Sequence, residues 1–551
     1  MTTGLDTADL RKARGAFFTP ADLARYITEW AVRDPADKVL EPSCGEAAFL
    51  LAAGERLTAL GSASPDLHGH ELHRPSARQA EALLVAAGHP GAVEVGDFFT
   101  RVPAPEYDAV IGNPPYVRYQ EFSGINRALS REAALRAGVN LTGLASSWAA
   151  FTVHAALFLK DGGRLGLVLP AELLSVNYAS EVRAFLMRRF GRVRLVLFKD
   201  RVFPGVLEEV VLLLAEGTGG VDHMELLQVD DVAALHDQVT KPAFTTWKPL
   251  PAEGKWTEAL LPRDTLEALA SLANHKGVTT LKTWGKTTLG AVTGNNAYFA
   301  LRPSMVERLG IPERELLRIS PPGSRHLRGL TFTLAAWRAL RGEDHRVWLW
   351  RPPLDRPSAA SEAYRLVGEK EAVHEAYKCS VRTPWWRVPV APPADLLLTC
   401  MNADTPRLTT NRARAYHLNS VHGVCLQDAH REIGRRLLPM ASLNTLTLLG
   451  AETVGRAYGG GMLKLEPREA DRLPVPSPAL VTAHKAALTA LRPAVTAALR
   501  RGELLDAARM IDKVLLVDGL GLSQKRVAAL ETGHAGMTAR RTARGKSALV
   551  G

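Results

Sequence analysis

The segment with the clearest chemical potential is Asn113-Pro114-Pro115-Tyr116, which follows an apolar run ending at Ile111. The side-chain oxygen of Asn113 accepts hydrogen bonds, and the Pro114 carbonyl, which has no ladder partner, accepts them too. Two convergent acceptors suit an –NH2 group, which has two protons to donate. Tyr116 adds a flat face on which a planar ring can stack. The segment predicts a pocket for an amino or amide nitrogen on a planar group. A proline-rich surface turn is the alternative, and the preceding apolar run argues against it.

A strand must end where this segment begins. The stretch from Asp108 to Ile111 has an acidic start and an apolar run, which predicts the end of a buried strand. Two prolines then fix φ and remove two N–H donors, so neither can extend the strand. Open α/β sheets bind ligands at the carboxyl ends of their strands. A stiff loop at this place suits chemistry that needs its groups placed in advance.

A second loop with binding chemistry precedes it. A short strand ends at Glu41, the chain turns through Pro42, Ser43, Cys44 and Gly45, and a helix begins near Ala47. A turn that opens onto a helix N-terminus offers backbone N–H groups to an anion such as a carboxylate. Nicotinamide dinucleotides require a GxGxxG pattern, whereas this loop has one glycine and Ala47 at the second position. This loop argues against such a cofactor.

Two acidic residues end the strands that follow. Glu71 closes the strand candidate 66–70, and an acidic side chain at the end of a second strand commonly accepts from ribose hydroxyls. The third strand candidate, over 93–99, runs into Asp97 and Phe98. Both positions fall where a sheet of parallel strands would place a ligand.

The order of elements predicts the fold class. Thr19 can cap a helix over 21–32, with Pro20 at its first position. Strands and helices then alternate, which predicts an α/β, doubly wound, mostly parallel sheet with helices on both faces. Residues 117–147 have weak periodicity and are expected to form a mobile connection. Further strands are expected over 165–169, 192–198 and 210–215.

Composition restricts the class of protein. With 551 residues the chain is long enough for two or three domains, and 46% hydrophobic residues fit a soluble globular protein. No apolar run approaches the roughly 18 residues of a membrane helix, and the N-terminus lacks a signal-peptide pattern. The four cysteines form no CxxC pair. We expect a reduced, cytoplasmic protein without structural zinc or any other metal.

Charge is distributed unevenly. Residues 1–240 contain 23 Lys and Arg and 30 Asp and Glu, a net charge of −7. Residues 241–551 contain the remaining 68 − 23 = 45 basic and 57 − 30 = 27 acidic residues, a net charge of +18. A strongly basic second half indicates that this half meets a polyanion. The sequence thus predicts a catalytic domain over 1–240, a basic domain over 241–530, and a disordered basic tail over 531–551.

Basic and aromatic residues occur together in the second half, a mixture that suits contact with phosphates and bases. They are Arg314, Arg318, Arg325, Arg328, Arg382, Trp385, Trp386, Arg387, Arg407, Arg412 and Arg414.

The motifs together resemble the gamma group of N6-adenine DNA methyltransferases. Asn113 to Tyr116 is similar to the signature of S-adenosylmethionine-dependent amino-methyltransferases, and the segments 15–20 and 38–50 resemble their donor-binding motifs. Thr293-Gly-Asn-Asn-Ala-Tyr-Phe299 and the stretches 458–467 and 473–476 resemble the family's target recognition domain. Ala47 departs from the family's glycine. The resemblance implies a class I methyltransferase fold followed by an α+β target recognition domain.

The resemblance also implies roles for single residues. Asn113 and the Pro114 carbonyl would hold the target nitrogen, and Tyr116 and Phe203 would enclose a flipped base, with Pro115 completing the catalytic motif. Asp97 would read the adenine amino group of S-adenosylmethionine, and Phe98 would pack on its ring. The full set of residues expected to bind the donor is Thr19, Pro20, Glu41, Pro42, Ser43, Cys44, Gly45, Glu71, Asp97 and Phe98.

Two groups share the Asn-Pro-Pro-Tyr signature, so alternatives remain. A glutamine-N5 methyltransferase acting on release factors needs no basic domain of this size, and an RNA adenine methyltransferase is the other alternative. A fusion to a nuclease is disfavoured because the fold begins by about residue 14, and a silent DNA-binding subunit is disfavoured by the intact motif. We expect N6-methylation of a flipped adenine in double-stranded DNA by a monomer. The associated partner would be a restriction endonuclease that acts on the same site.

Overall fold

The computed structural model describes residues 19–122, 124–199, 202, 209–235, 243–249 and 254–547. The chain divides into two compact units, 1–260 and 261–551, which are considered separately below.

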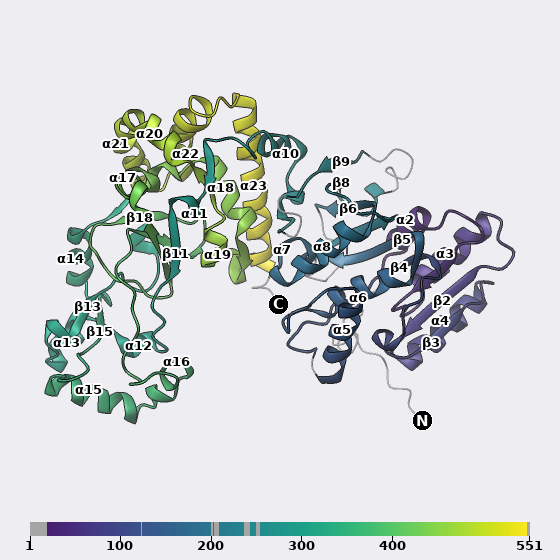
Figure 1. The fold of residues 1–551 in the computed structure, drawn as a ribbon, viewed down its shortest axis with the longest axis horizontal. Helices are drawn as coiled ribbons and strands as arrows, with labels where there is room; N and C mark the ends of the chain where they lie inside the picture. The colour runs from purple at the N-terminus through teal and green to yellow at the C-terminus, as the bar shows by residue number, and fades with distance from the viewer. Residues whose placement is uncertain are drawn as a thin grey trace. The chain divides into compact units, whose positions relative to one another are not determined.

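A nine-stranded sheet forms the centre of the first unit (Figure 1). Its strands follow the order β3-β2-β1-β4-β5-β7-β6-β8-β9. Strands β1 to β5 are mutually parallel, β7 runs antiparallel to both β5 and β6, and β8 is parallel to β6. The bounds are β1 Lys38–Glu41, β2 Asp66–Glu71, β3 Ala92–Val95, β4 Tyr107–Gly112, β5 Leu159–Pro170, β6 Arg192–Phe198, β7 Val210–Glu216, β8 Met224–Val229 and β9 Thr245–Trp247. The predicted doubly wound, mostly parallel sheet is confirmed.

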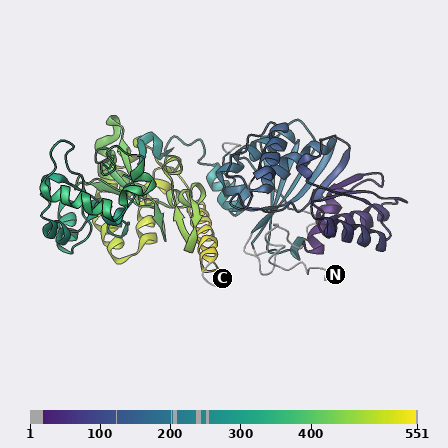
Figure 2. The same ribbon diagram turned by 90° about the horizontal axis from the view of Figure 1, so that it is seen from below.

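Helices cover both faces of this sheet (Figure 2). One group, α2 (Ala21–Ala31), α3 (Ala48–Ala59) and α4 (Arg74–Ala86), packs on β1 to β5 through an apolar core that includes Leu23, Ile27 and Phe49. A second group contains α5 (Gly124–Arg136), α6 (Ser147–Ala155) and α8 (Ser180–Arg189), which contact one another. Alternate residues of a strand point to opposite faces, so β5 packs against both groups of helices. Val168 lies in the core with Leu23 and Ile27, and Leu167 lies on the side of α6.

Three expectations for this unit need correction. Residues 117–147 were expected to be a mobile connection, yet 124–136 form helix α5. Thr19 does not cap α2, whose N-cap is Pro20 without a side-chain bond, because the Thr19 hydroxyl accepts from Asn113 instead. The contacts divide the chain after Leu260 rather than at 240, because β9 pairs with β8 in the same sheet.

The second unit combines smaller sheets with helices, in agreement with the predicted α+β class. A five-stranded sheet has the order β11-β19-β16-β18-β14, with bounds Gly285–Leu289, Val421–Leu426, Leu396–Thr399, Leu408–Asn411 and Thr331–Phe332. Two three-stranded sheets are also present, β12-β15-β13 (Ala300–Leu301, Trp348–Trp350, Leu316–Arg318) and β17-β21-β20 (Met401–Asn402, Met462–Lys464, Arg456–Tyr458). Its main helices are α10 (Arg263–Ala270), α14 (Leu334–Gly342), α15 (Ala359–Lys370), α17 (Arg431–Ala441), α18 (Thr445–Val454), α21 (Lys485–Arg501) and α22 (Leu504–Asp512).

The predicted disordered tail over 531–551 is wrong for its described part. Residues Gln524–Ser547 form one helix, α23, which packs against α10 and α18. Arg541 is buried on this helix, and its guanidinium lies 2.8 Å from the Glu452 carboxylate. The composition of the segment is poor in large apolar residues, but a buried ion pair and small side chains hold it in place.

The described ranges contain neither a membrane-spanning helix nor a cluster of metal ligands. No helix in these ranges is long and apolar enough to cross a membrane. Likewise, these residues contain no group of three or more His, Cys, Asp or Glu side chains that could hold a metal ion.

Candidate active site

The loop after β4 is hydrogen-bonded to two other parts of the chain, the Thr19 hydroxyl before α2 and the Val168 carbonyl of β5. The Asn113 amide nitrogen donates to the Thr19 hydroxyl at 3.2 Å, which directs the amide oxygen to the other side. The Tyr116 hydroxyl lies 2.7 Å from that oxygen and 3.0 Å from the Val168 carbonyl of β5, so its one proton is shared between two acceptors. A carbonyl oxygen has two lone pairs, so Asn113 Oδ1 keeps capacity for a second donor.

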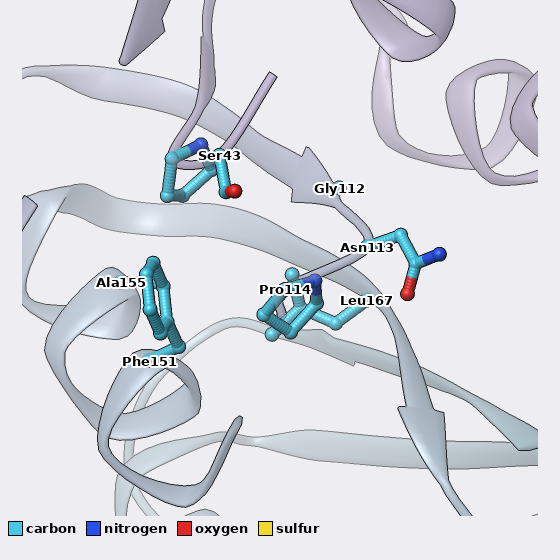
Figure 3. A pocket seen from close by; sticks show the side chains of 8 residues that line it. Ser43, Gly112, Asn113, Pro114, Phe151, Ala155 and Leu167 are labelled. Carbon is cyan, nitrogen blue, oxygen red and sulfur yellow. The ribbon is translucent and has the colours of Figure 1, made fainter. Parts of the chain in front are cut away.

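This loop shares a pocket with the loop after β1. Pro42 and Ser43 line one side, Gly112, Asn113 and Pro114 line another, and side chains of α6 and β5 complete it. Figure 3 shows the Phe151 ring facing Pro114, while the Asn113 side chain extends away from Ser43 and Phe151. A Cβ added at Gly112 would lie 3.5 Å from Cγ of Glu41, which is ordinary van der Waals contact. The two predicted binding loops are thus neighbours at the carboxyl edge of the sheet.

The Glu41 side chain has a structural role that could not be predicted from the sequence. Its side chain is 3% exposed and accepts a hydrogen bond from the Leu50 N–H at 3.1 Å, in the first turn of α3. The Glu41 oxygen thus satisfies one of the N–H groups that a helix N-terminus leaves without a helical partner. Burial raises the pKa of Glu41 well above its ordinary value, because a charged carboxylate would lose its hydration.

The turn between β1 and α3 has a strained backbone. Gly45 has φ +49°, and a Cβ added there would meet nothing within 4 Å, so open space adjoins this residue. Ala47 has φ 63° and ψ 29°, in the left-handed region that costs an alanine roughly 1–2 kcal/mol. The family's glycine at this position would adopt the same conformation without that cost. The open side of Gly45 fits the close approach of a donor molecule.

Glu71 lies beside this turn, as its place at the end of β2 predicts. One carboxylate oxygen accepts from the Gly45 N–H at 2.9 Å, and the other accepts from the His73 N–H at 2.8 Å. The side chain is half-buried and is fixed by these two bonds. The carboxylate therefore holds the Gly45 turn at the carboxyl edge of the sheet.

Asp97 and Phe98 follow β3 at the same edge. Asp97 caps a single 3₁₀ turn over Phe98–Thr100, with its side chain accepting from the Phe99 N–H at 2.9 Å. Phe98 is buried among aromatic rings, 5.7 Å from Phe151 in a stacked arrangement and 4.9 Å from His154. The predicted contact of Phe98 with the donor's adenine remains a prediction.

A neutral histidine forms part of this aromatic cluster. His154 is fully buried on α6, and its Nε2 lies 3.2 Å from the Phe98 carbonyl oxygen. Burial lowers the pKa of His154 to about 4, because a charged imidazolium would lose its hydration. At neutral pH the ring is uncharged, so the Phe98 carbonyl accepts from a protonated Nε2.

The structure brings most of the predicted site residues together. Thr19, Asn113 and Tyr116 are linked by hydrogen bonds, and Pro42, Ser43, Asn113 and Pro114 line one pocket. Pro20 is the N-cap residue of α2, and Pro115 lies within the Asn113 loop. Cys44 is buried, and its N–H donates to the His70 carbonyl oxygen. Phe203 lies outside the described residues.

Sequence reasoning missed the residues that α6 and β5 contribute. Phe151, Ala155 and Leu167 line the pocket, and the Val168 carbonyl accepts from Tyr116. Apolar residues of an expected helix and strand look like ordinary core, so their pattern carried no signal of a site. They could have been located only from the expected pairing of β5 with β4, which places the end of β5 beside the Asn113 loop.

The fold and this site define a class of protein. A sheet with the order β3-β2-β1-β4-β5-β7-β6, an Asn-Pro-Pro-Tyr loop after β4 and a turn with open glycine after β1 describe a doubly wound amino-methyltransferase. Residues 6–219 match the family described as N-6 DNA Methylase. Residues 253–516 match the C-terminal domain of the type II methyltransferase M.Eco57I. Residues 6–219 thus belong to the N-6 DNA methylase family, and the chain is an adenine-specific DNA methyltransferase of the type II class.

Relatives match along most of the chain. The type II methyltransferase M.XamI of Xanthomonas campestris pv. amaranthicola is 26% identical over 479 residues, covering 84% of this chain and 85% of that protein. M.AccI of Acinetobacter calcoaceticus is 22% identical over 476 residues, with the same two coverages. The DNA-bound structure of the type IIL restriction-modification enzyme MmeI is similar in fold, with a TM-score of 0.56 and 13% identity. That similarity covers 97% of this chain and 80% of the MmeI chain.

Proposed function

We propose that this chain transfers a methyl group from S-adenosylmethionine to N6 of an adenine extruded from duplex DNA at a specific sequence. The observation that carries the proposal is the shared pocket, which Pro42 and Ser43 of the donor loop line together with Gly112, Asn113 and Pro114. An amino group and a methyl donor held on these two sides would lie close enough to react.

The Asn113 loop would hold the amino nitrogen by its two protons. Asn113 Oδ1 and the Pro114 carbonyl oxygen are the acceptors, and within the described residues no hydrogen bond occupies that carbonyl. Two acceptors on the two N–H bonds direct the nitrogen lone pair toward the donor side of the pocket. S-adenosylmethionine supplies an electrophilic methyl group, so the amine needs no covalent attachment to the enzyme. The proton that N6 loses passes to solvent.

Tyr116 and the proposed partner Phe203 would enclose the adenine ring. An adenine inside the duplex is stacked and cannot reach such a pocket, so the enzyme must extrude it. Stacking between a base and an aromatic side chain is worth roughly 1–3 kcal/mol, which offsets part of the cost of unstacking.

The residues around the donor loop fit S-adenosylmethionine. Gly45 leaves open space on its exposed side, and Glu71 lies at the end of β2, where ribose hydroxyls are commonly bound. Asp97 is fixed at the next strand end, where it would accept from the donor's adenine amino group. Thr19 and Pro20, at the start of α2, would contact the donor near Asn113.

The second unit would recognise DNA. Residues 261–551 carry 45 − 3 = 42 basic and 27 − 2 = 25 acidic residues, a net charge of +17, which favours a polyanion. Four of the arginines singled out from the sequence are exposed there: Arg314, Arg325, Arg412 and Arg414. Others have structural roles, since Arg407 is buried against Asp404 and Trp386 lies in the core.

We further propose that methylation at this site protects DNA from a restriction endonuclease of the same specificity. Relatives are named type II methyltransferases, which supports this biological role. A single chain carries both the pocket and the basic unit, so a monomer suffices for methylation of one strand at a time.

The first experiment identifies the product. Purified protein is incubated with methyl-labelled S-adenosylmethionine and unmethylated genomic DNA, and the DNA is digested to nucleosides. Labelled N6-methyladenine is expected. Asn113→Ala should lower the rate by roughly 100- to 1,000-fold, because it removes one of the two acceptors for the reacting group.

The control is Gln79→Ala, which removes an equal carboxamide from the exposed face of α4 and should leave the rate unchanged. Label in cytosine would show that the enzyme methylates cytosine and not the predicted adenine. Label in a release factor, or in RNA with none in DNA, would support one of the alternative methyltransferases instead.

A further inference from the structure

Ser147, the first residue of α6, holds the chain on both sides of Tyr116. Its hydroxyl donates to the Pro115 carbonyl oxygen and accepts from the Val117 N–H at 2.9 Å. Its own N–H donates to the Val117 carbonyl oxygen at 3.1 Å. One residue thus engages three main-chain groups adjacent to Tyr116.

The place of Ser147 on its helix explains these bonds. The first N–H groups of a helix have no partner within the helix, so that of Ser147 can bond to Val117. The side chain is 2% exposed, and water does not compete for its hydroxyl. A buried hydrogen bond is costly to leave unmade, so this contact fixes the geometry of the loop.

None of these three bonds involves the Pro114 carbonyl, which we propose as an acceptor for the amine. Ser147 takes the carbonyl of Pro115, whereas that of Pro114, one residue earlier, accepts no hydrogen bond within the described residues. At the other end of the motif, Thr19 orients the Asn113 amide. The two acceptors proposed for the amine therefore lie between two fixed points, Thr19 and Ser147.

Helix α6 also forms part of the pocket itself. Phe151 and Ala155 line the pocket on this helix, with the Phe151 ring facing Pro114 (Figure 3). Ser147, at the start of the same helix, couples that wall to the loop that would carry the reacting amine.

We propose that Ser147 is a positioning residue for methyl transfer, which sets the angle of the Tyr116 ring and of the Pro114 carbonyl relative to the donor. The inference rests on the proposed function. Ser147 is buried and is not among the residues that line the pocket, so it would act through the 115–117 peptide groups. Its loss should lower the rate of the chemical step while leaving the binding of both substrates intact.

The alternative is that Ser147 only stabilises the fold. Helix α6 is anchored independently, because Trp148, Ala149 and Val153 are all buried. Deletion of one hydroxyl leaves that packing in place, so the folded protein should persist and its kinetics can be measured.

The test compares two variants that each lose one hydroxyl from α6. Ser147→Ala breaks the bonds to Pro115 and Val117. Thr152→Val, the matched control, removes a buried hydroxyl that donates only to the Trp148 carbonyl within the helix. For each variant, single-turnover methylation of genomic DNA is measured at saturating S-adenosylmethionine, together with the dissociation constants for both substrates and the thermal midpoint.

The expected result is a rate constant about 10- to 100-fold lower for Ser147→Ala, with both dissociation constants within about twofold of wild type. Thr152→Val should retain the wild-type rate. Ser147→Thr keeps a hydroxyl at the same Cβ, and should recover most of the rate wherever it folds as judged by its thermal midpoint.

Three outcomes would overturn the inference. One is a wild-type rate for Ser147→Ala, and another is an equal loss in Thr152→Val. The third is a parallel loss of donor affinity and thermal midpoint, which indicates a structural role. If wild-type enzyme labels no adenine, the proposed function fails first and the inference falls with it, so the two failures are distinguishable.

Discussion

At the scale of single residues, Tyr116 combines two functions that can be separated. Its ring offers a stacking face, whereas its hydroxyl bonds to Asn113 Oδ1 and to the Val168 carbonyl. The hydroxyl holds the amide oxygen in place through one lone pair and leaves the other for an amine. The same group therefore orders the amide oxygen that we propose as an acceptor for the amine.

Tyr116→Phe tests this division because it keeps the ring and removes the hydroxyl. We expect kcat to fall by about 10-fold, the equivalent of one net hydrogen bond, while KM for DNA stays unchanged. Tyr116→Ala removes both functions and should cost roughly 10-fold more, with a higher KM for DNA. Steady-state kinetics on genomic DNA provide the measurement. Identical kinetics for the two variants would show that the ring contributes nothing.

At the scale of elements, α23 is secured by one buried ion pair. The Arg541 guanidinium bonds to both Glu452 oxygens, at 2.9 and 2.8 Å, and to the Ala403 and Asp404 carbonyls, at 3.2 and 3.0 Å. It also donates to the Gly461 carbonyl. Helix α23 is thereby joined to α18 and to two loops of the second unit.

Arg541→Ala should destabilise the second unit by about 3–5 kcal/mol, because it leaves the Glu452 carboxylate buried without its charge partner. Urea unfolding measures the loss. Lys525→Ala, on the exposed side of the same helix, is the control and should change stability by less than about 0.5 kcal/mol. A double variant, Arg541→Met with Glu452→Leu, should regain much of the loss. An Arg541→Ala protein as stable as the control would contradict this account.

The sequence predicted the elements that carry local signals. Strands β1, β4 and β6 have short apolar runs bounded by charges or turn residues. The ends of these strands and of β2 lie within a residue or so of the expected positions. The Asn113 loop could be located because two prolines must end a strand.

Elements stabilised by small or distant side chains could not be predicted. Helix α5 buries only Ser130, Ala133 and Ala134, so it has no large apolar stripe. Helix α23 depends on Glu452, which lies 89 residues before Arg541. The hydrogen bonds of Glu41 and Ser147 likewise join groups that no periodic pattern connects.

At the scale of the whole molecule, histidines with lowered pKa values in both units make the folded protein less stable at acid pH. Burial lowers the pKa to about 4 for His154 in the first unit and for His326 and His417 in the second. Neither ring nitrogen of His417 has a hydrogen-bond partner within the described residues. Asp512 acts in the opposite sense, because burial raises its pKa to about 6.

The sign of the pH dependence follows. In the unfolded chain these histidines are protonated near their ordinary pKa of 6.5, whereas in the folded protein they are protonated only near pH 4. Stability from these groups is therefore complete above pH 6.5 and is lost as the pH falls toward 4, by on the order of 2–3 kcal/mol for each histidine. Asp512 partly offsets this loss, since its contribution is largest below pH 3.8 and disappears as the pH rises through 6.

We expect the thermal midpoint of the wild type to fall between pH 7.5 and 5.0, and to fall less in His154→Gln and in His417→Gln. Calorimetry at the two pH values provides the comparison. His345→Gln, at an exposed position, is the control. If the midpoint of a variant falls as far as that of the wild type, the substituted histidine does not contribute to the loss of stability at acid pH.

The left-handed backbone at Ala47 has a consequence for how such an enzyme can evolve. Exchange of this alanine for glycine would release roughly 1 kcal/mol of backbone strain, but it would also remove a fully buried methyl group and add conformational freedom to the unfolded chain, which together cost about as much. The opposing effects nearly cancel, so alanine and glycine give similar stability at this turn. A lineage can therefore exchange one residue for the other at position 47 without loss of the fold.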